Sequence, residues 1–298
     1  MVKPTIDGFE RAHHAIVAAM RGFSLIASLL SILIAPLASA AWATEAVFPD
    51  SSALTAGQEA MVTQVIDGDT LVLDDGGSVR LVGIQAPKIP LGREGVAPWP
   101  LGDQAKAALA DLARGARVRL YYGGRRVDRY RRRLAHVRRG DGLWLQGEML
   151  RRGLARVYSF ADNRAVVPDM LALERDARAH RRGIWDHPYY RVRDHREAPN
   201  FIGSFQLVEG LVRKVAEVRG RTYINFGDDW RQDFTIVIQG GALKRFESFD
   251  PISLTDRRVR VRGWVQRWNG PMIEASHSGQ IELLLNAAAT SGKQEGTE

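Results

Sequence analysis

Between residues 60 and 186, short apolar runs typical of strands alternate with longer amphipathic stretches typical of helices. The strands predicted by this pattern are 61–66, 70–73, 79–84, 118–122 and 134–137. The Asp-Asp-Gly-Gly sequence at 74–77 predicts a hairpin turn between the second and third. The predicted helices are 103–114, with Asp103 as N-cap, 144–152 and about 167–182. This element order predicts an α+β fold, mainly β, in which an antiparallel barrel packs against helices.

The second half of the chain shows another set of short strands. The predicted elements are strands 206–215, 222–226 and 234–238, a short helix near 242–248, and strands 257–264, 272–275 and 280–285. Three strands, a helical connection and further strands match the order of a small OB-like β-barrel. Periodicity alone leaves another small barrel or a sandwich open.

Changes in composition suggest where the domains begin and end. The predicted division is a leader at 1–43, a linker at 44–60, a first domain at 61–186, a linker at 187–202, a second domain at 203–286 and a disordered tail at 287–298.

The N-terminus has the layout of a secretory signal peptide. Basic residues precede an uncharged, apolar run at 22–44, Pro36 interrupts it, and the small residues at 38–40 have cleavage-like spacing. We therefore expect an exported protein, periplasmic or secreted, with no stable membrane partner once the signal is cleaved. The alternative is an uncleaved membrane anchor formed by 22–44.

Charge and cysteine content narrow the possible functions. The formal net charge of +8 favours polyanionic partners, although it says nothing about the fold. The absence of cysteine excludes disulfides, thiolate metal sites and cysteine nucleophiles. The seven histidines show no ligand spacing, and no Ser-His-Asp arrangement is visible.

Candidate chemistry begins where the first predicted strand ends. Asp67 and Asp69 flank a glycine there, and two carboxylates at this spacing can hold a hard cation. Arg80, on a following strand, can bind a phosphate with its guanidinium fork. Taken alone, the acidic triplet is also an ordinary turn sequence.

Further motifs follow in a characteristic order. They are Ala86-Pro87, Asp128-Arg129-Tyr130-Arg131-Arg132-Arg133-Leu134-Ala135, Leu154-Ala155-Arg156-Val157-Tyr158 and Arg182-Gly183-Ile184-Trp185. With these motifs in this order and spacing, the segment 61–186 resembles the staphylococcal nuclease (thermonuclease) family. The resemblance leaves out the N-terminal segment and the second domain.

The resemblance implies a five-stranded OB-type barrel with three helices, and Ca²⁺-assisted hydrolysis of phosphodiesters in DNA and RNA. It implies that Asp69 is a calcium carboxylate with Asp67 as its acidic neighbour. It also implies that Arg80 and Arg132 are the catalytic arginines. A cation and two guanidiniums would stabilise the charge that develops on the phosphoryl oxygens.

The chain departs from the family at two positions of one loop. The family's second metal carboxylate aligns with Gln85, and its glutamate, the proposed general base, aligns with Lys88. A glutamine still offers an oxygen, as does the Ala86 carbonyl, so we expect Ca²⁺ to bind more weakly or another divalent cation to replace it. A lysine is protonated at neutral pH and cannot accept a proton, which leaves its role at a catalytic position open. Glu94 is a possible substitute base, although a solvated loop acid is the more ordinary interpretation.

Two basic regions suggest nucleic-acid contacts. The run 125–139 holds eight arginines and one aspartate, and nearby acids look too few to neutralise them. The residues of this run expected to contact nucleic acid are Arg125, Arg126, Arg129, Tyr130, Arg131 and Arg133. In the second domain, Arg260 and Arg262 alternate with valines, and tryptophans stand at 230, 264 and 268. A half-buried strand and a nucleic-acid groove explain that pattern equally well.

The sequence therefore favours an exported, thermonuclease-like hydrolase of DNA or RNA with an atypical site. The alternative is an inactive or weak module on the same fold that binds nucleic acid or another polyanion.

Overall fold

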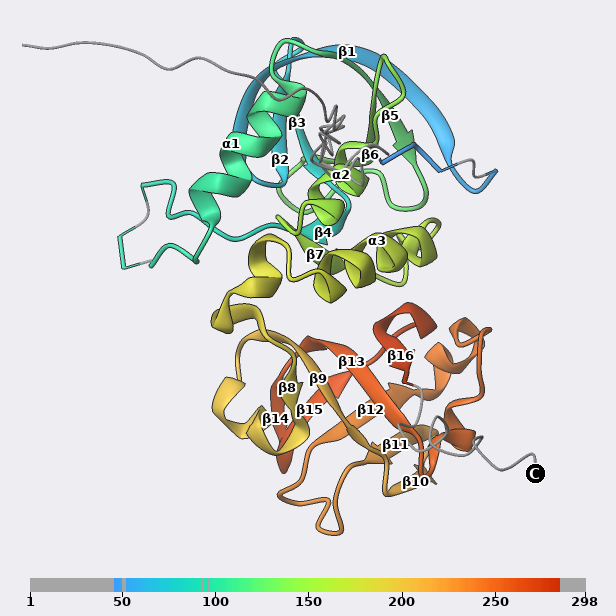
Figure 1. Cartoon of the computed structure of the whole chain (residues 1–298). Coiled ribbons are helices and arrows are strands. Elements are labelled where there is room, and N and C mark those ends of the chain that lie inside the picture. The colour runs from blue at the N-terminus through green and yellow to red at the C-terminus, as the bar shows by residue number, and fades with distance from the viewer. Residues whose placement is uncertain (1–45, 50–51, 93, 96, 285–298) are drawn as a thin grey trace, which may run out of the picture. The chain divides into compact units, whose positions relative to one another are not determined.

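The structure of the protein is a computed structural model that describes residues 46–49, 52–92, 94–95 and 97–284 (Figure 1). The predicted leader and the predicted tail lie outside the described residues. Within the described part, no helix is both long and apolar enough to cross a membrane.

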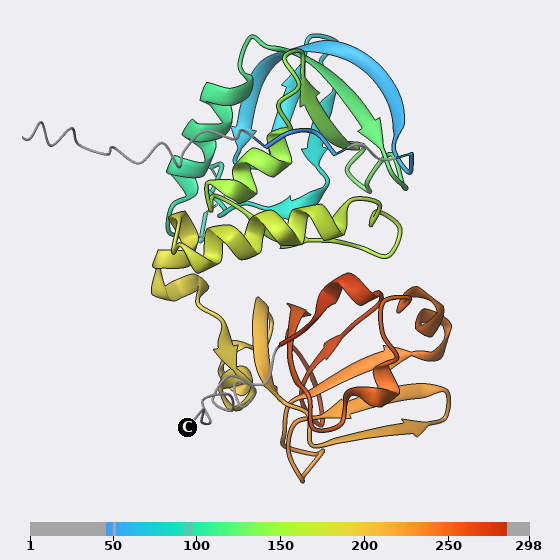
Figure 2. The ribbon, with the colours of Figure 1, turned by 45° about the vertical axis from the view of Figure 1, so that its right-hand side comes forward.

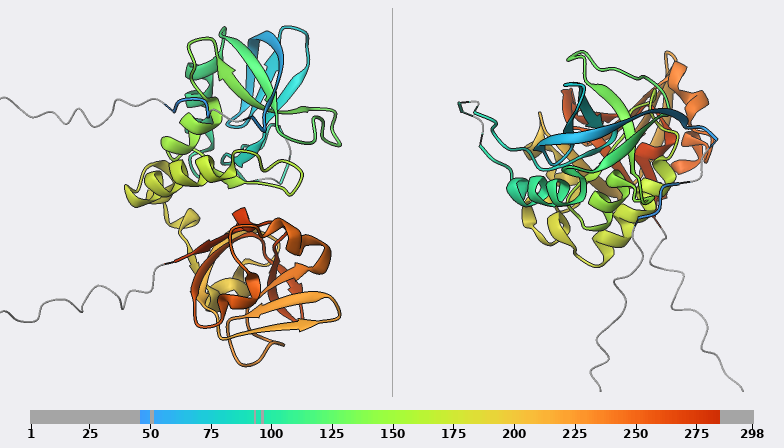
Figure 3. Two further views of the ribbon diagram at one scale, coloured as in Figure 1. Left: turned by 90° about the vertical axis from the view of Figure 1, so that its right-hand side faces the viewer. Right: turned by 90° about the horizontal axis from the view of Figure 1, so that it is seen from above.

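The first half is built on a closed five-stranded barrel, as predicted. Its strands, in barrel order, are β1 (Thr55–Asp67), β2 (Thr70–Leu73), β3 (Ser78–Leu81), β6 (Arg133–Arg139) and β5 (Arg117–Tyr122). Neighbouring strands are antiparallel except β3 and β6, which are parallel. The long β1 curves around the barrel and pairs with both β2 and β5 (Figure 3).

Three α-helices accompany the barrel. They are α1 (Gly102–Ala113), α2 (Leu145–Arg151) and α3 (Val167–Ala179). Figure 2 shows α1 beside the barrel strands and α2 next to α3. Their apolar faces join the inward side chains of the strands in one core, in which Leu109 and Met170 are fully buried. The predicted barrel with three helices is therefore confirmed.

A small additional ladder holds the loop after the third strand. The run predicted as a single strand 79–84 is interrupted after Leu81, and Gly83, with φ of 84°, begins the next strand, β4 (Gly83–Gln85). β4 then pairs with β7 (Arg156–Tyr158), a strand too short for periodicity to predict. This ladder fixes the loop that contains Gln85.

The second half contains two sheets. One has the order β10 (Lys214–Val218), β11 (Arg221–Asn225), β12 (Thr235–Gln239), β15 (Gly270–Glu274) and β14 (Gln266–Trp268). The other has the order β16 (Ile281–Leu283), β13 (Arg258–Trp264), β9 (Phe205–Leu211) and β8 (Arg193–Asp194). β12 and β15 are parallel, like β3 and β6 in the first half. That this half is an OB-like barrel stays a prediction.

Both segments predicted as linkers contain regular structure. β1 begins at Thr55, inside 44–60, because its polar first residues pair with β5 rather than fill a core. The segment 187–202 contains β8 and the 3₁₀ helices η2 (Pro188–Tyr190) and η3 (His195–Phe201), following η1 (Gly183–Asp186). Asp194 and Glu197 form a capping box at η3. Pairing and capping stabilise such segments without an apolar period.

Other predicted boundaries also shift. Leu101, not Asp103, is the N-cap of α1, and Asp103 lies in the first turn, where its charge complements the helix dipole. The predicted strand 206–215 is divided into β9 and β10. The helix predicted near 242–248 is the 3₁₀ helix η4 (Gly240–Arg245). The remaining short helices are η5 (Pro251–Leu254) and η6 (Ser278–Gln280).

Candidate active site

The acidic turn lies between β1 and β2, with its carboxylates buried. Asp69 is fully buried, and Asp67 accepts a hydrogen bond of 3.0 Å from the Asp69 amide. A Cβ on Gly68 would lie 2.6 Å from the Cβ of Ala86 and 2.8 Å from that of Ala105. Glycine is therefore required here by close packing against α1 and the following loop, which makes this more than an exposed turn.

Asp69 is the centre of a charge cluster. Arg80 Nη1 lies 2.7 Å from its Oδ1, and the Ala86 amide donates to its Oδ2 at 2.9 Å. Lys88 Nζ lies 3.0 Å from Oδ1 and 2.8 Å from Oδ2, and 3.9 Å from Asp67 Oδ2. The structure thus brings Asp67, Asp69, Arg80 and Lys88 together, with the ammonium between the two acids.

The two carboxyls of this cluster differ in proton affinity. Burial alone would raise the pKa of Asp69, but the charges of Arg80 and Lys88 outweigh it and hold that pKa at about 2. The pKa of Asp67 is raised, by burial and then by the charge of Asp69. Asp69 is therefore a fixed anion that the two cations neutralise.

Gln85 points away from this cluster. Its Oε1 accepts hydrogen bonds from Arg156 Nε at 3.0 Å and Nη2 at 2.7 Å. Arg156 is buried among aromatic rings, 4.6 Å from the Phe205 ring centroid and 5.7 Å from that of Trp99. Burial lowers the pKa of Arg156 to about 10. Arg156 was not predicted from the sequence as a site residue, although it lies in one of the motifs that carry the resemblance.

These residues do not fit a divalent cation. Both Asp69 oxygens already accept from cationic groups, and the Gln85 oxygen accepts from Arg156. The nitrogen of Lys88 lies where a cation would contact Asp69. Among the described residues, no three His, Cys, Asp or Glu side chains converge as a metal site. The carboxylate-rich shell that Ca²⁺ prefers is therefore missing.

Arg80 and Arg132 line a common cleft of about 370 Å³, bordered also by Tyr130, Tyr158 and Asn163. Arg80 donates to Asp69 and to the carbonyls of Leu81 and Ile84, whereas its Nε–H has no partner within the described residues. Asp128 holds Arg132 through Nε and Nη2, both at 2.8 Å. Arg132 Nη1 has no partner there either, so each guanidinium retains donors for an anion.

The arginine run is more neutralised than its sequence suggests. Four of its arginines pair with aspartates: Arg125 with Asp162, Arg132 with Asp128, Arg133 with Asp75 and Arg139 with Asp141. Three of the four partners lie outside the run. Within the described residues, the other four arginines of the run, Arg126, Arg129, Arg131 and Arg138, form no ion pair, so the acids still do not neutralise the whole run. Arg125, Arg129 and Tyr130 border the cleft, whereas Arg126 lies over the Tyr122 ring and Arg131 is exposed.

The basic strand of the second half is not a free cationic surface. Arg262 in β13 is buried and pairs with Glu174 of α3 through both terminal nitrogens at 2.9 Å, and with Glu282 at 2.5 Å. Arg260 Nη2 pairs with Glu209 at 2.8 Å. Both arginines therefore fit the interpretation of a half-buried strand, which the sequence left open beside that of a nucleic-acid groove.

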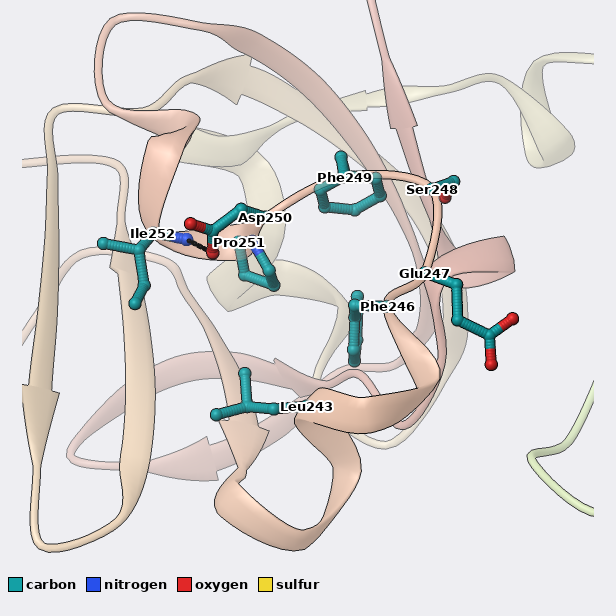
Figure 4. A pocket seen from close by; sticks show the side chains of 8 residues that line it. All are labelled: Leu243, Phe246, Glu247, Ser248, Phe249, Asp250, Pro251 and Ile252. Carbon is teal, nitrogen blue, oxygen red and sulfur yellow. Dashed lines mark hydrogen bonds between the residues drawn. The ribbon is translucent and has the colours of Figure 1, made fainter.

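Two further features lie outside the cluster and the cleft. Glu94 is exposed in the loop after Lys88 and makes no hydrogen bond or ion pair within the described residues. A hollow in the second half, shown in Figure 4, is lined by Leu243, Phe246 and Phe249, and its Asp250 caps the Ile252 amide. No set of reactive side chains converges in it.

Comparison with known proteins agrees with this geometry. The family model "Staphylococcal nuclease homologue" matches residues 78–187. A thermonuclease of Staphylococcus intermedius is 30% identical over 142 residues, which are 47% of this chain and 83% of that protein. An uncharacterized endonuclease of Escherichia coli O157:H7 is 34% identical over 127 residues, 42% of this chain and 74% of the relative. Protein ParB of Escherichia coli is 30% identical over 180 residues, 57% and 88% of the two chains.

Three findings support a nuclease-like function at the level of the family: a closed barrel with three helices, two arginines at one cleft, and relatives named as nucleases. The family implies nucleic acid as the substrate. This chain belongs to the staphylococcal nuclease family.

Proposed function

We propose that the chain binds a phosphodiester of DNA or RNA in the cleft between Arg80 and Arg132 and hydrolyses it without a divalent cation. The observation that carries the proposal is that both arginines line the same cleft with donors left unpaired. Two guanidiniums directed at one phosphate stabilise the negative charge of the transition state.

Lys88 has a defined part in this scheme. Its ammonium neutralises Asp69, so that this carboxylate does not cancel the charge of Arg80, which lines the cleft. We therefore propose that hydrolysis does not depend on Ca²⁺, in contrast to the expectation from the resemblance. The phosphate of the substrate binds to the two arginines in the cleft. Arg125, Arg129 and Tyr130, which also line the cleft, extend the contact along the nucleic-acid strand.

The assay compares the wild type with Arg132→Ala on plasmid DNA and on RNA, in EDTA and in Ca²⁺, Mg²⁺ or Mn²⁺. We expect cleavage in EDTA at a rate similar to that in Ca²⁺, and a loss of about 10²–10³-fold on removing Arg132. Arg114→Ala, which removes an exposed arginine at the end of α1, is the matched control and should leave the rate unchanged.

A second function is favoured by one observation, the ion pair of Lys88 with Asp69 where the family has a proton acceptor. In that case the cleft binds nucleic acid without cleaving it. Wild-type protein that leaves DNA and RNA intact in every metal, yet binds them with steep salt dependence, would establish this function and reject hydrolysis.

We also propose that the protein is exported after cleavage of its leader. The basic, apolar and small-residue regions of 1–43 support this, although they lie outside the described residues. Mass spectrometry of the mature protein tests it: an N-terminus near residue 41 is expected, and a retained leader in the membrane fraction would indicate the anchor instead.

A further inference from the structure

One face of the sheet β10-β11-β12-β15-β14 forms a groove of about 710 Å³. Every second residue of each strand lines it, and the register brings these residues into rows across the sheet. Ala216 lies opposite Tyr223, and Tyr223 opposite Val237. In the next row, Thr235 lies opposite Met272. The groove is therefore a continuous surface formed by the sheet itself.

The alternate residues of the same strands belong to the core. Ile224, Ile236 and Ile273 are fully buried in the second hydrophobic cluster. A sheet with one face in a core normally presents polar side chains on the other. Here the outer face also carries apolar residues, among them Val218, Tyr223 and Met272, beside its polar side chains, and this apolar part of the surface indicates a binding site.

Two tryptophans stand at this groove with their rings largely open to solvent. Trp230, from the loop between β11 and β12, is 50% exposed, and Trp268 of β14 is 59% exposed. Each lies against a guanidinium: the Arg231 carbon is 4.5 Å from the Trp230 ring, and that of Arg221 is 5.5 Å from the Trp268 ring. Exposed rings paired with cations form a surface on which flat π-systems stack and phosphates find positive charge.

We propose that this groove binds a single-stranded nucleic acid, with unpaired bases stacked on Trp230 and Trp268. Lys214 and Arg221 line the groove and supply charge for the backbone phosphates. Stacking on a side chain requires a base outside a duplex, so the groove selects single strands.

The acids and amides of the groove fit base edges. Asp228 and Glu274 also line it, which makes it less positive than a simple phosphate track. Carboxylates accept hydrogen bonds from the amino groups of cytosine and adenine, and Gln266 and Asn269 offer both donors and acceptors. An oligosaccharide could also lie on exposed tryptophans, and the test below includes that outcome.

This inference rests on the proposed nucleic-acid chemistry of the chain, but it does not require hydrolysis. The groove residues belong to β10–β15 and their loops, and none of them lines the cleft between Arg80 and Arg132. If the wild type does not cleave nucleic acid but its binding of single strands depends on the two tryptophans, the proposed hydrolysis alone is refuted. If the wild type cleaves nucleic acid but its binding of single strands does not depend on the two tryptophans, this inference alone is refuted.

The test measures fluorescence anisotropy of labelled oligo(dT) and of a duplex of equal length, in EDTA, with the full chain carrying Arg132→Ala to weaken the cleft. We expect the single strand to bind more tightly than the duplex. Trp230→Ala and Trp268→Ala should each lower affinity for the single strand by about 5- to 150-fold, and Trp268→Tyr should restore most of it.

Tyr189→Ala is the matched control, because Tyr189 is an aromatic residue that is 43% exposed and lies outside both the groove and the cleft. Equal affinity in the Trp230→Ala and Trp268→Ala variants and the control would overturn the proposal. So would equal dependence of duplex binding on the two tryptophans. Quenching of tryptophan fluorescence by a chitin-type tetrasaccharide but not by oligo(dT) would assign the groove to carbohydrate and also overturn it.

Discussion

The partly buried ammonium of Lys88, in the loop after β4, donates to both carboxylate oxygens of Asp69, at 3.0 and 2.8 Å. Asp69 is fully buried, so its charge must be compensated in place. Lys88 and Arg80 provide that compensation. Lys88 thus places a positive charge beside Asp69, at a position where the resemblance implies an acid.

Replacing this lysine by an acid should create a metal site. Lys88→Glu would place three carboxyl groups, those of residues 67, 69 and 88, around the position now taken by the ammonium. We expect the variant to bind Ca²⁺ with a Kd of about 10⁻⁴–10⁻³ M, and the wild type to show no binding in isothermal titration calorimetry. Lys244→Glu, at an exposed lysine, is the charge-matched control. Ca²⁺ binding by the wild type as tight as by the variant would contradict the assignment of Lys88.

The buried pair of Glu174 and Arg262 should be the most sensitive ionic contact in the chain to substitution. Burial would raise the pKa of Glu174, but Arg262 and then Arg178 lower it, so the carboxylate is charged inside the protein. Within the described residues, Glu174→Gln leaves the buried Arg262 with Glu282 as its one acidic partner and should cost about 3–5 kcal/mol in urea unfolding.

Asp176→Asn is the control on the same helix. Asp176 is half exposed and pairs with Arg182 at the surface, so its loss should cost less than about 1 kcal/mol. Glu174 lies on α3, in the first half of the chain, and Arg262 lies on β13, in the second half. If one half of the Glu174→Gln variant unfolds in a separate, earlier transition, this pair links the stabilities of the two halves. Equal losses of unfolding free energy in Glu174→Gln and Asp176→Asn would show that burial does not increase the contribution of the ion pair to stability.

His136 should make the fold sensitive to acid. Burial lowers its pKa to about 3, and its Nδ1 has no hydrogen-bond partner. The unfolded chain, with a histidine pKa of about 6.5, therefore binds the extra proton first, and stability falls as the pH drops from about 6.5 towards 3. The loss between pH 7.5 and 5 should be about 2 kcal/mol.

His136→Phe keeps a ring in the core and should remove most of this loss, as measured by urea unfolding at the two pH values. His180→Asn, at an exposed histidine of α3's C-cap, should not. His277, whose pKa burial lowers to about 4, contributes a loss of similar size and the same sign in both variants, so about half of the combined loss of the two histidines should remain in His136→Phe. An unchanged pH dependence in His136→Phe would assign the acid sensitivity elsewhere.

The fold of the first half could be predicted because its signals are local. Alternating apolar residues, the turn before Ser78 and the amphipathic helices lie within short windows, and ordered motifs connect them. The ladder β4–β7 could not be predicted, because three-residue strands have no measurable period. The polar start of β1 was missed for a related reason: it is held by backbone pairing with β5, which composition does not record.

At the site, the sequence by itself determined which groups are present: Asp67, Asp69, Arg80 and Arg132, with Gln85 and Lys88 where acids were expected. Only the tertiary structure decided what those substitutions do. It directs Gln85 to Arg156 and places Lys88 against Asp69. It also buries Arg262 and leaves Trp230 and Trp268 at a groove. The physical reason is that the effect of a charge or a ring depends on burial and partners, and partners distant in sequence are brought together only by folding.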